Sequence, residues 1–305
     1  MTRTVPLLAS HAALSLAGSL HLPAGEPVAT VLMVPGSGPS DRDNDVYFPM
    51  IRAGLLARGI AAASFDKRGV GESSGDWHDT GPDEQATDVA AQLACLRDTH
   101  AIDEAQLGLF GHSQGGWVAL DVAAADPSVA FVVANSGPGV SPLRQERFAL
   151  GAQMAAKDIP ADRIEEAMRR FDELTELIRS DATHVDIEAF LAADDEAGTD
   201  LRQFAFWPAD PRELDLIRRW ADHDPRPALE RITCPLLALF GGAERVVPVV
   251  ESEAVYREAF ARRPDLLRIE IFPGADHRLM VGTPPALHPA YASILADWIR
   301  GVMAV

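Results

Sequence analysis

The sequence predicts an α/β protein in which a mostly parallel sheet is flanked by helices and carries an all-helical insertion. Short apolar runs alternate with stretches of helical period over residues 1–137 and again over 228–305. This alternation is typical of the strand–helix–strand units of a parallel sheet. Residues 138–227 between them are charged, alanine-rich and helical in period, without a strong strand pattern. We therefore predict a core domain formed by the two outer ranges and a helical lid formed by the middle one.

The individual elements follow from periodicity and from end signals. Residues 14–22 alternate between apolar and polar or small side chains, which predicts an early antiparallel strand. Mainly apolar runs of strand length predict buried strands at residues 28–34, 60–65, 106–110, 129–134 and 235–240. A further strand is predicted at residues 267–272. Helical period and N-terminal signals predict core helices over residues 46–58, 80–97, 115–125, 250–262 and 289–302.

Composition disfavours several classes of function. The net charge of −18 repels phosphate backbones and anionic lipid, so we expect no nucleic-acid or membrane partner. The two cysteines, Cys95 and Cys234, form no Cys-x-x-Cys pair, which indicates a reducing compartment. The N-terminal stretch has no long apolar run, so we expect a cytoplasmic protein. The sequence is compatible with a homo-oligomer. No Gly-x-Gly-x-x-Gly follows a strand and no phosphate-binding loop is present, so we expect no cofactor.

Ser113 is the candidate nucleophile. Residues Gly111 to Gly115 read Gly-His-Ser-Gln-Gly, and they stand where a predicted strand turns into a predicted helix. A sharp turn of this kind lifts the serine above the carboxyl edge of the sheet, and the glycines relieve crowding there. The positive end of the helix favours an anion at the serine.

A second Gly-x-Ser-x-Gly match lies at Gly71 to Gly75, with Ser73 at its centre. It follows Asp66 to Gly69 and precedes Asp76 to Asp79, with no helix start. We therefore interpret Ser73 as a loop residue.

A serine hydroxyl needs a base, and the base needs an orienting acid. His277 follows the last predicted strand and therefore lies at the same sheet edge as Ser113. Glu244 is the carboxylate in the loop after the preceding strand, and it is the candidate acid. Asp276 adjoins His277, but its side chain is expected to face elsewhere.

These residues give the chain order serine, acid, histidine, and the whole chain resembles the α/β-hydrolase family. The segments from Gly36 to Asp43 and from Asp66 to Ser73 are similar to those of bacterial serine esterases in that family. The resemblance implies the α/β-hydrolase fold, a helical cap at residues 138–227 and a serine hydrolase activity. This chain departs from the usual aspartate by carrying Glu244 as the acid.

Acyl transfer also requires N–H donors for the developing oxyanion. The backbone N–H of Gln114 supplies one. The glycine-containing loop after residues 28–34 supplies the other, and alignment with the family pattern assigns it to Ser37, with Gly38 as the alternative.

The acidic residues Asp41, Asp43 and Asp45 have the spacing of half a calcium loop, but the positions that need glycine and glutamate hold other residues. We therefore expect no metal site. We expect Arg42 and Arg68 to join these three acids in a structural network.

The predicted lid contains several aromatic residues, and Phe206 and Trp207 are the candidates for substrate contact. The favoured function is hydrolysis of a small-molecule carboxylic ester through an acyl-enzyme. A peptidase, a thioesterase and an acyltransferase or cyclase use the same three residues and remain alternatives. A non-catalytic binding protein on this fold is disfavoured, because no member of the set is missing.

Overall fold

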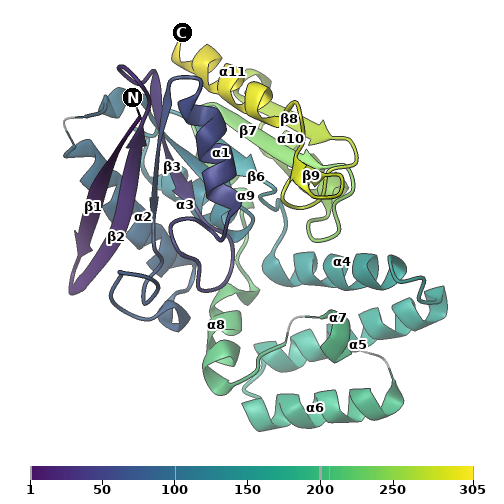
Figure 1. The fold of residues 1–305 in the computed structure, drawn as a ribbon. Helices are drawn as coiled ribbons and strands as arrows, with labels where there is room; N and C mark the ends of the chain where they lie inside the picture. The colour runs from purple at the N-terminus through teal and green to yellow at the C-terminus, as the bar shows by residue number, and fades with distance from the viewer. Residues whose placement is uncertain (1, 100, 199–200, 206, 305) are drawn as a thin grey trace.

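A computed structural model describes residues 2–99, 101–198, 201–205 and 207–304. The core is one eight-stranded sheet in the order β1-β2-β4-β3-β5-β6-β7-β8, with helices on both faces (Figure 1). β1 and β2 pair antiparallel, β2 pairs antiparallel with β4, and every pair from β4 to β8 is parallel. The strands are β1 Arg3–His11, β2 Leu14–Leu22, β3 Ala29–Val34, β4 Ile60–Phe65, β5 Leu107–His112, β6 Val132–Asn135, β7 Leu236–Gly241 and β8 Leu267–Phe272.

The α-helices fall into a core set and a set inserted between β6 and β7. The core set is α1 Tyr47–Leu56, α2 Pro82–Arg97, α3 Gln114–Ala125, α9 Arg226–Arg231, α10 Val249–Ala259 and α11 Tyr291–Met303. The inserted set is α4 Pro142–Ala155, α5 Ala161–Arg179, α6 His184–Ala197, α7 Leu201–Phe204 and α8 Pro211–Ala221. Short 3₁₀ turns η1, η2 and η3 cover Trp77–Asp79, Glu104–Gln106 and Pro264–Leu266, and β9 Met280–Val281 pairs with β10 Ala286–Leu287. In the described part of the chain, no helix combines the length and apolar character needed to cross a lipid bilayer.

The sheet separates two apolar cores because successive side chains of a strand point to opposite faces. On β3, Leu32 and Val34 pack into one core with α2, α3, α9 and α10. Val31 and Met33 pack into the other core with α1 and α11. The central strands β3 to β7 are buried along their length, which explains why their sequences are continuous apolar runs.

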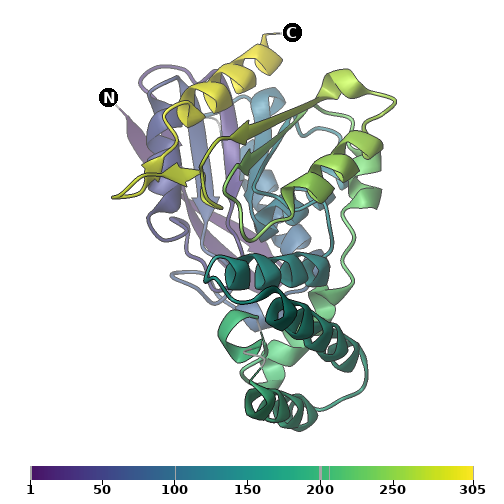
Figure 2. The same cartoon turned by 90° about the vertical axis from the view of Figure 1, so that its right-hand side faces the viewer.

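The inserted helices form a separate layer with an apolar cluster of their own, which includes Leu150, Phe171 and Leu191. Figures 1 and 2 show α4 between the core and helices α5 and α6, while α8 lies beside α4 and also reaches the core. Contacts from both α4 and α8 dock the layer on the core. The Arg144 guanidinium on α4 pairs with Glu251 on α10, and the Trp220 indole N–H on α8 donates to the Thr80 carbonyl.

The predicted strands and core helices are confirmed, with shifts of a few residues at their ends. β1 and the β9–β10 pair were not predicted. β1 is an edge strand, and its burial pattern gives only Leu7 and Ala9 buried sites, so its apolar signal is weak. The expectation that Ser73 is a loop residue is confirmed, because its hydroxyl donates to the Asp66 carbonyl and accepts the Ala17 N–H, both at 2.9 Å.

The predicted network of Arg42 and Arg68 with Asp41, Asp43 and Asp45 is wrong. Arg42 pairs with Asp66 and Glu72, each at 2.6 Å, because the Asp66 carboxylate at the end of β4 also accepts the Arg42 N–H.

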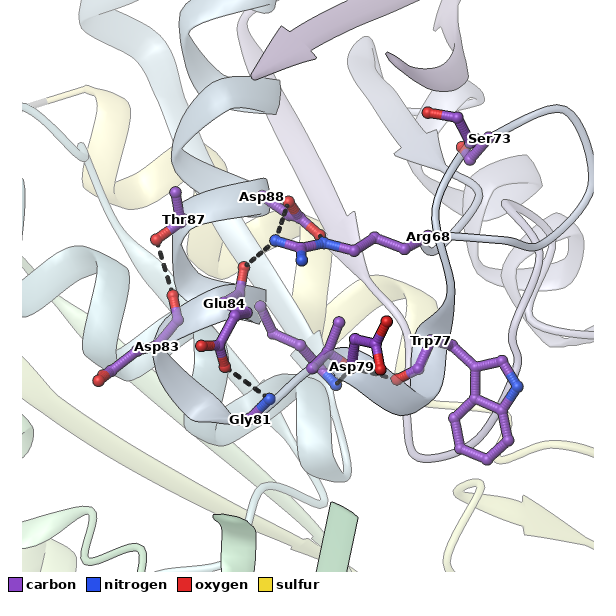
Figure 3. A network of polar contacts seen from close by, with 12 residues as sticks. Arg68, Ser73, Trp77, Asp79, Gly81, Asp83, Glu84, Thr87 and Asp88 are labelled. Atoms are coloured by element: carbon purple, nitrogen blue, oxygen red, sulfur yellow. Dashed lines mark hydrogen bonds and ion pairs between the residues drawn. The ribbon is translucent and has the colours of Figure 1, made fainter. Parts of the chain in front are cut away.

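Arg68 turns the other way, to Asp88 on α2, and Figure 3 shows this pair above the start of the helix. Two of the acids predicted to join the network have other partners: Asp43 pairs with Arg52, and Asp45 pairs with Arg278.

A buried polar pair lies where the inserted helices return to the core. His223 Nε2 lies 3.6 Å from the Asp121 carboxylate on α3, and the His223 ring packs edge-on against Trp117 and Trp220. Burial raises the pKa of Asp121 to about 7 and lowers the pKa of His223. At neutral pH this burial favours the uncharged forms, so the contact is not a stable ion pair.

Replacing Asp121 with Asn tests this environment. Wild-type Asp121 holds its proton up to about pH 7 when folded but only to about pH 4 when unfolded, so its contribution to stability is lost as pH rises between these values. We expect the Asn variant to gain stability relative to wild type as the pH is raised from 4 to 8. Urea denaturation at four pH values measures the difference. A difference that does not change with pH contradicts the raised pKa.

Candidate active site

The candidate residues meet because the strands from β4 to β8 are parallel, so their carboxyl ends lie at one edge of the sheet. Ser113 follows β5, Glu244 lies in the loop after β7, and His277 lies in the loop after β8. The loop after β3 brings Gly36 and Ser37 to the same edge.

Ser113 stands in an unusual backbone conformation between β5 and α3, with φ 53° and ψ −121°. A non-glycine residue adopts such a conformation only where the surrounding structure imposes it. The flanking glycines make the turn possible. A Cβ on Gly111 would lie 2.1 Å from the Gly115 carbonyl oxygen, and one on Gly115 would lie 2.3 Å from the Val34 carbonyl oxygen.

Ser113, His277 and Glu244 form a continuous hydrogen-bonded row. His277 Nε2 lies 3.0 Å from Ser113 Oγ, and His277 Nδ1 lies 2.9 Å from Glu244 Oε2. The Glu244 side chain is 1% exposed and that of His277 is 21% exposed. The row therefore leads from a buried carboxylate, through a partly exposed imidazole, to the largely buried Ser113.

The second oxygen of Glu244 is held by the backbone. Oε1 accepts the N–H groups of Arg245 at 2.9 Å and Val246 at 2.8 Å. Because one oxygen is fixed in this way, the other is directed at His277. The longer glutamate side chain thus reaches the imidazole with good geometry.

The side chains of Asp276 and His112, which adjoin the row in sequence, are held by other partners. The Asp276 carboxylate turns back to accept the N–H groups of Arg278 and Met280. The His112 ring points away from the row, into a buried network with Asn135, and its centroid lies 5.2 Å from that of His277. Burial lowers the pKa of His112 far below its usual value, so a neutral ring lies beside His277.

The segments that carry the two predicted oxyanion donors adjoin Ser113. Gln114 is the first residue of α3, so its N–H has no carbonyl partner within that helix. Gly36 lies against the turn, because a Cβ placed on it would come within 3.5 Å of Ser113 Cβ. Ser37 is the next residue of this loop, and its role as a donor stays a prediction.

Two charged residues near this row were not predicted to have a role. Lys67 follows β4, and its ammonium bonds the Gly36 carbonyl and the Gln114 side chain. Glu146 lies on α4, where burial raises its pKa and both the Gln145 amide and the nearby His277 oppose the rise. The sequence offered one hint that Lys67 is unusual: it is one of only two lysines among the 27 lysine and arginine residues of the chain. Glu146 carried none, because its meeting with His277 depends on how the inserted helices fold back.

Trp207, one of the two predicted substrate contacts, lies in the inserted layer. Trp207 packs beside the apolar cluster of the inserted helices, its indole N–H donates to the Arg202 carbonyl, and the Arg202 guanidinium lies 4.9 Å from its ring centroid. Phe206 lies outside the described residues. A role for either in substrate binding stays a prediction.

Comparison with known families and curated proteins identifies one matching family and several distant relatives. A family model described as the alpha/beta hydrolase family matches residues 31–290. Esterase EstD of Thermotoga maritima is 24% identical over 272 residues, which cover 88% of this chain and 58% of EstD. This chain therefore spans less than two thirds of that relative. An uncharacterised 31.7 kDa protein of Escherichia coli is 21% identical over 218 residues, covering 70% of this chain and 72% of the relative.

Solved structures share the fold at low identity. An esterase of Pyrococcus furiosus superposes with a TM-score of 0.66 at 18% identity, covering 99% of this chain and 91% of the other. A proline iminopeptidase of Mycobacterium smegmatis gives 0.66 at 17% identity, covering 98% and 99%. At these identities the likeness shows the fold and leaves the substrate open.

The close packing at the Ser113 turn predicts that alanine substitution at Gly115 and at Gly301 has different effects on the free energy of unfolding. Gly115→Ala forces a Cβ against the Val34 and Pro35 carbonyl oxygens, at 2.3 and 2.6 Å, so we expect a loss of about 1–3 kcal/mol in the free energy of unfolding. Gly301→Ala is the control, because a Cβ there meets nothing within 4 Å and lies in helix α11. It should leave stability unchanged or raise it by up to about 1 kcal/mol. Chemical denaturation of both variants measures this, and equal stabilities would contradict the tight turn.

Proposed function

The chain belongs to the α/β-hydrolase family, and from this premise we propose that it is a serine hydrolase that cleaves carboxylic esters through an acyl-enzyme. One observation carries the proposal: the hydrogen-bonded row from Glu244 through His277 to Ser113, with distances of 2.9 and 3.0 Å. In this proposal Ser113 is the nucleophile, His277 the base and Glu244 the orienting acid of a catalytic triad.

The row accounts for both halves of the reaction. Ser113 Oγ attacks the ester carbonyl carbon while its proton moves to His277 Nε2, and the carbonyl electrons become an oxyanion. Collapse of this intermediate breaks the bond to the alkoxide, which leaves as the alcohol after taking the proton from His277. A water molecule then attacks the acyl-enzyme, with His277 again as base, and releases the carboxylic acid and Ser113.

The oxyanion would be held by the N–H groups of Ser37 and Gln114. Their segments lie on either side of Ser113, and the N-terminal end of α3 adds a favourable dipole. Fixed donors of this kind contribute most in the transition state, where the oxygen carries its full charge.

The inserted helices, together with the connections from residue 138 to 227, would act as a cap over the site. The support is that Glu146 on α4 lies close enough to His277 for their charges to interact. A small-molecule acyl substrate would bind between the cap and the sheet edge. EstD and the Pyrococcus furiosus protein, both described as esterases, support the ester class.

Hydrolysis of p-nitrophenyl esters over a range of acyl lengths tests the proposal. Ser113→Ala removes the attacking oxygen, so we expect turnover to fall at least about 10⁴-fold, to the level left by binding and the oxyanion donors. Labelling by a fluorophosphonate should also disappear in this variant. Unchanged turnover in Ser113→Ala would overturn the mechanism, while wild-type labelling without ester turnover would keep the serine nucleophile and overturn the ester substrate.

Glu244→Gln tests the role of the acid with almost no change in shape. The Arg245 and Val246 N–H groups select the amide oxygen, which turns the amide NH₂ toward His277 Nδ1. His277 must then accept at Nδ1 and carry its proton on Nε2, so it no longer takes the proton of Ser113. We expect kcat to fall by about 10⁴-fold with little change in thermal stability. A loss below about tenfold would show that Glu244 does not set the tautomer.

A further inference from the structure

Lys67 connects the two segments that carry the proposed oxyanion donors. It lies two residues after the end of β4, and its ammonium donates to the Gly36 carbonyl at 2.5 Å and to Gln114 Oε1 at 3.2 Å. One partner, Gly36, directly precedes the proposed donor Ser37, and the other, Gln114, is itself a proposed donor. The mechanism proposed above makes no use of this lysine.

The bond to Gly36 bears directly on the direction of the Ser37 N–H. In a trans peptide the C=O of one residue and the N–H of the next point in opposite directions within one plane. An ammonium that holds the Gly36 carbonyl on one side therefore directs the Ser37 N–H to the other side. A cation on the carbonyl also polarises the peptide and strengthens its N–H as a donor.

The position of Lys67 is itself fixed. Its N–H donates to the Ser40 carbonyl at 3.1 Å, and its neighbours Asp66 and Arg68 are turned away by their pairs with Arg42 and Asp88. The Gln85 amide lies on the far side of the Gln114 oxygen, at 3.5 Å. Among the described residues, no carboxylate lies within ion-pair distance of the Lys67 ammonium, so it is free to bond the two donor segments.

We propose that Lys67 is a positioning residue that sets the oxyanion hole, by directing and polarising the Gly36–Ser37 peptide and by tying it to Gln114. This inference rests on the proposed serine hydrolase function and adds a residue to it. The lysine acts through the two donors and does not contact the substrate. Replacing Lys67 should therefore reduce the stabilisation of the transition state and leave the hydrogen-bonded row of Ser113, His277 and Glu244 intact.

The test compares two inhibitors that differ in one atom, diethyl p-nitrophenyl phosphate and its thiophosphoryl analogue. In each, Ser113 Oγ forms a bond to phosphorus, its proton passes to His277 and p-nitrophenolate leaves. The phosphoryl oxygen accepts strong hydrogen bonds from the oxyanion donors, whereas the larger sulfur is a poor acceptor. The ratio of the two phosphorylation rates therefore reports the donors and cancels any change in Ser113 or His277.

For Lys67→Met we expect the phosphate to react about 10- to 100-fold more slowly, a fraction of the loss from deleting a donor outright, while the thiophosphate changes little. The rate ratio should fall by the same factor. Lys157→Met is the matched control, because Lys157 is exposed at the end of α4 and is the other lysine of the chain. An unchanged ratio in Lys67→Met overturns the proposal, as does an equal fall of both rates, which indicates a displaced serine.

A second measurement uses the unaltered protein and stands even if Lys67→Met does not fold. Burial lowers the pKa of Lys67 to about 7, so the charge is present below this pH and lost above it. The neutral amine still donates but polarises the peptide less. We expect the wild-type rate ratio to fall as pH rises from 6 to 8.5, and a constant ratio overturns the polarising part of the proposal.

The outcomes separate this proposal from the proposed function. Wild-type protein that reacts with the phosphate, together with a Lys67→Met variant of unchanged ratio, overturns the role of Lys67 alone. Wild-type protein that reacts with neither inhibitor overturns the serine nucleophile, and the role of Lys67 falls with it.

Discussion

The turn at Ser113 is the constraint on which the site depends. Its φ of 53° is possible because Gly111 and Gly115 pack backbone against backbone with no room for side chains. The same close packing seats Gly115 on the carbonyl oxygens of Val34 and Pro35, at the start of the loop after β3. One tight turn therefore positions the serine, begins α3 and brings the Gly36–Ser37 peptide alongside.

Two residues of opposite charge, Glu244 and Lys67, lie near this turn, and each is held by backbone groups. Glu244 is fixed by two N–H donors and faces His277, while Lys67 is fixed on the Gly36 carbonyl and faces the helix start. In the proposed mechanism the carboxylate lies where a positive imidazolium would form, and the ammonium lies near the two proposed oxyanion donors. This polarity is present in the protein before any substrate binds, which is the condition for electrostatic stabilisation without reorganisation.

The order of elements could be predicted because buried parallel strands and their covering helices leave strong periodic signals. The prediction missed β1 at the edge of the sheet, because this strand is only partly buried and polar residues interrupt its apolar pattern. The partners of Arg42 and Arg68 were also missed. Side-chain pairing depends on which strand ends lie beside one another, and Asp66 at the end of β4 outcompetes acids that are closer in sequence.

The sequence by itself determined the fold class, the inserted helices and the choice of Ser113, His277 and Glu244 as candidates for one sheet edge, because apolar periodicity and turn chemistry are local properties. Only the tertiary structure decided the contacts across that edge. The approach of Lys67 to Gly36 and of Glu146 to His277 joins segments that are far apart in the chain. Such meetings depend on the crossing of loops and on the docking of α4, which no pattern of residues along one segment records.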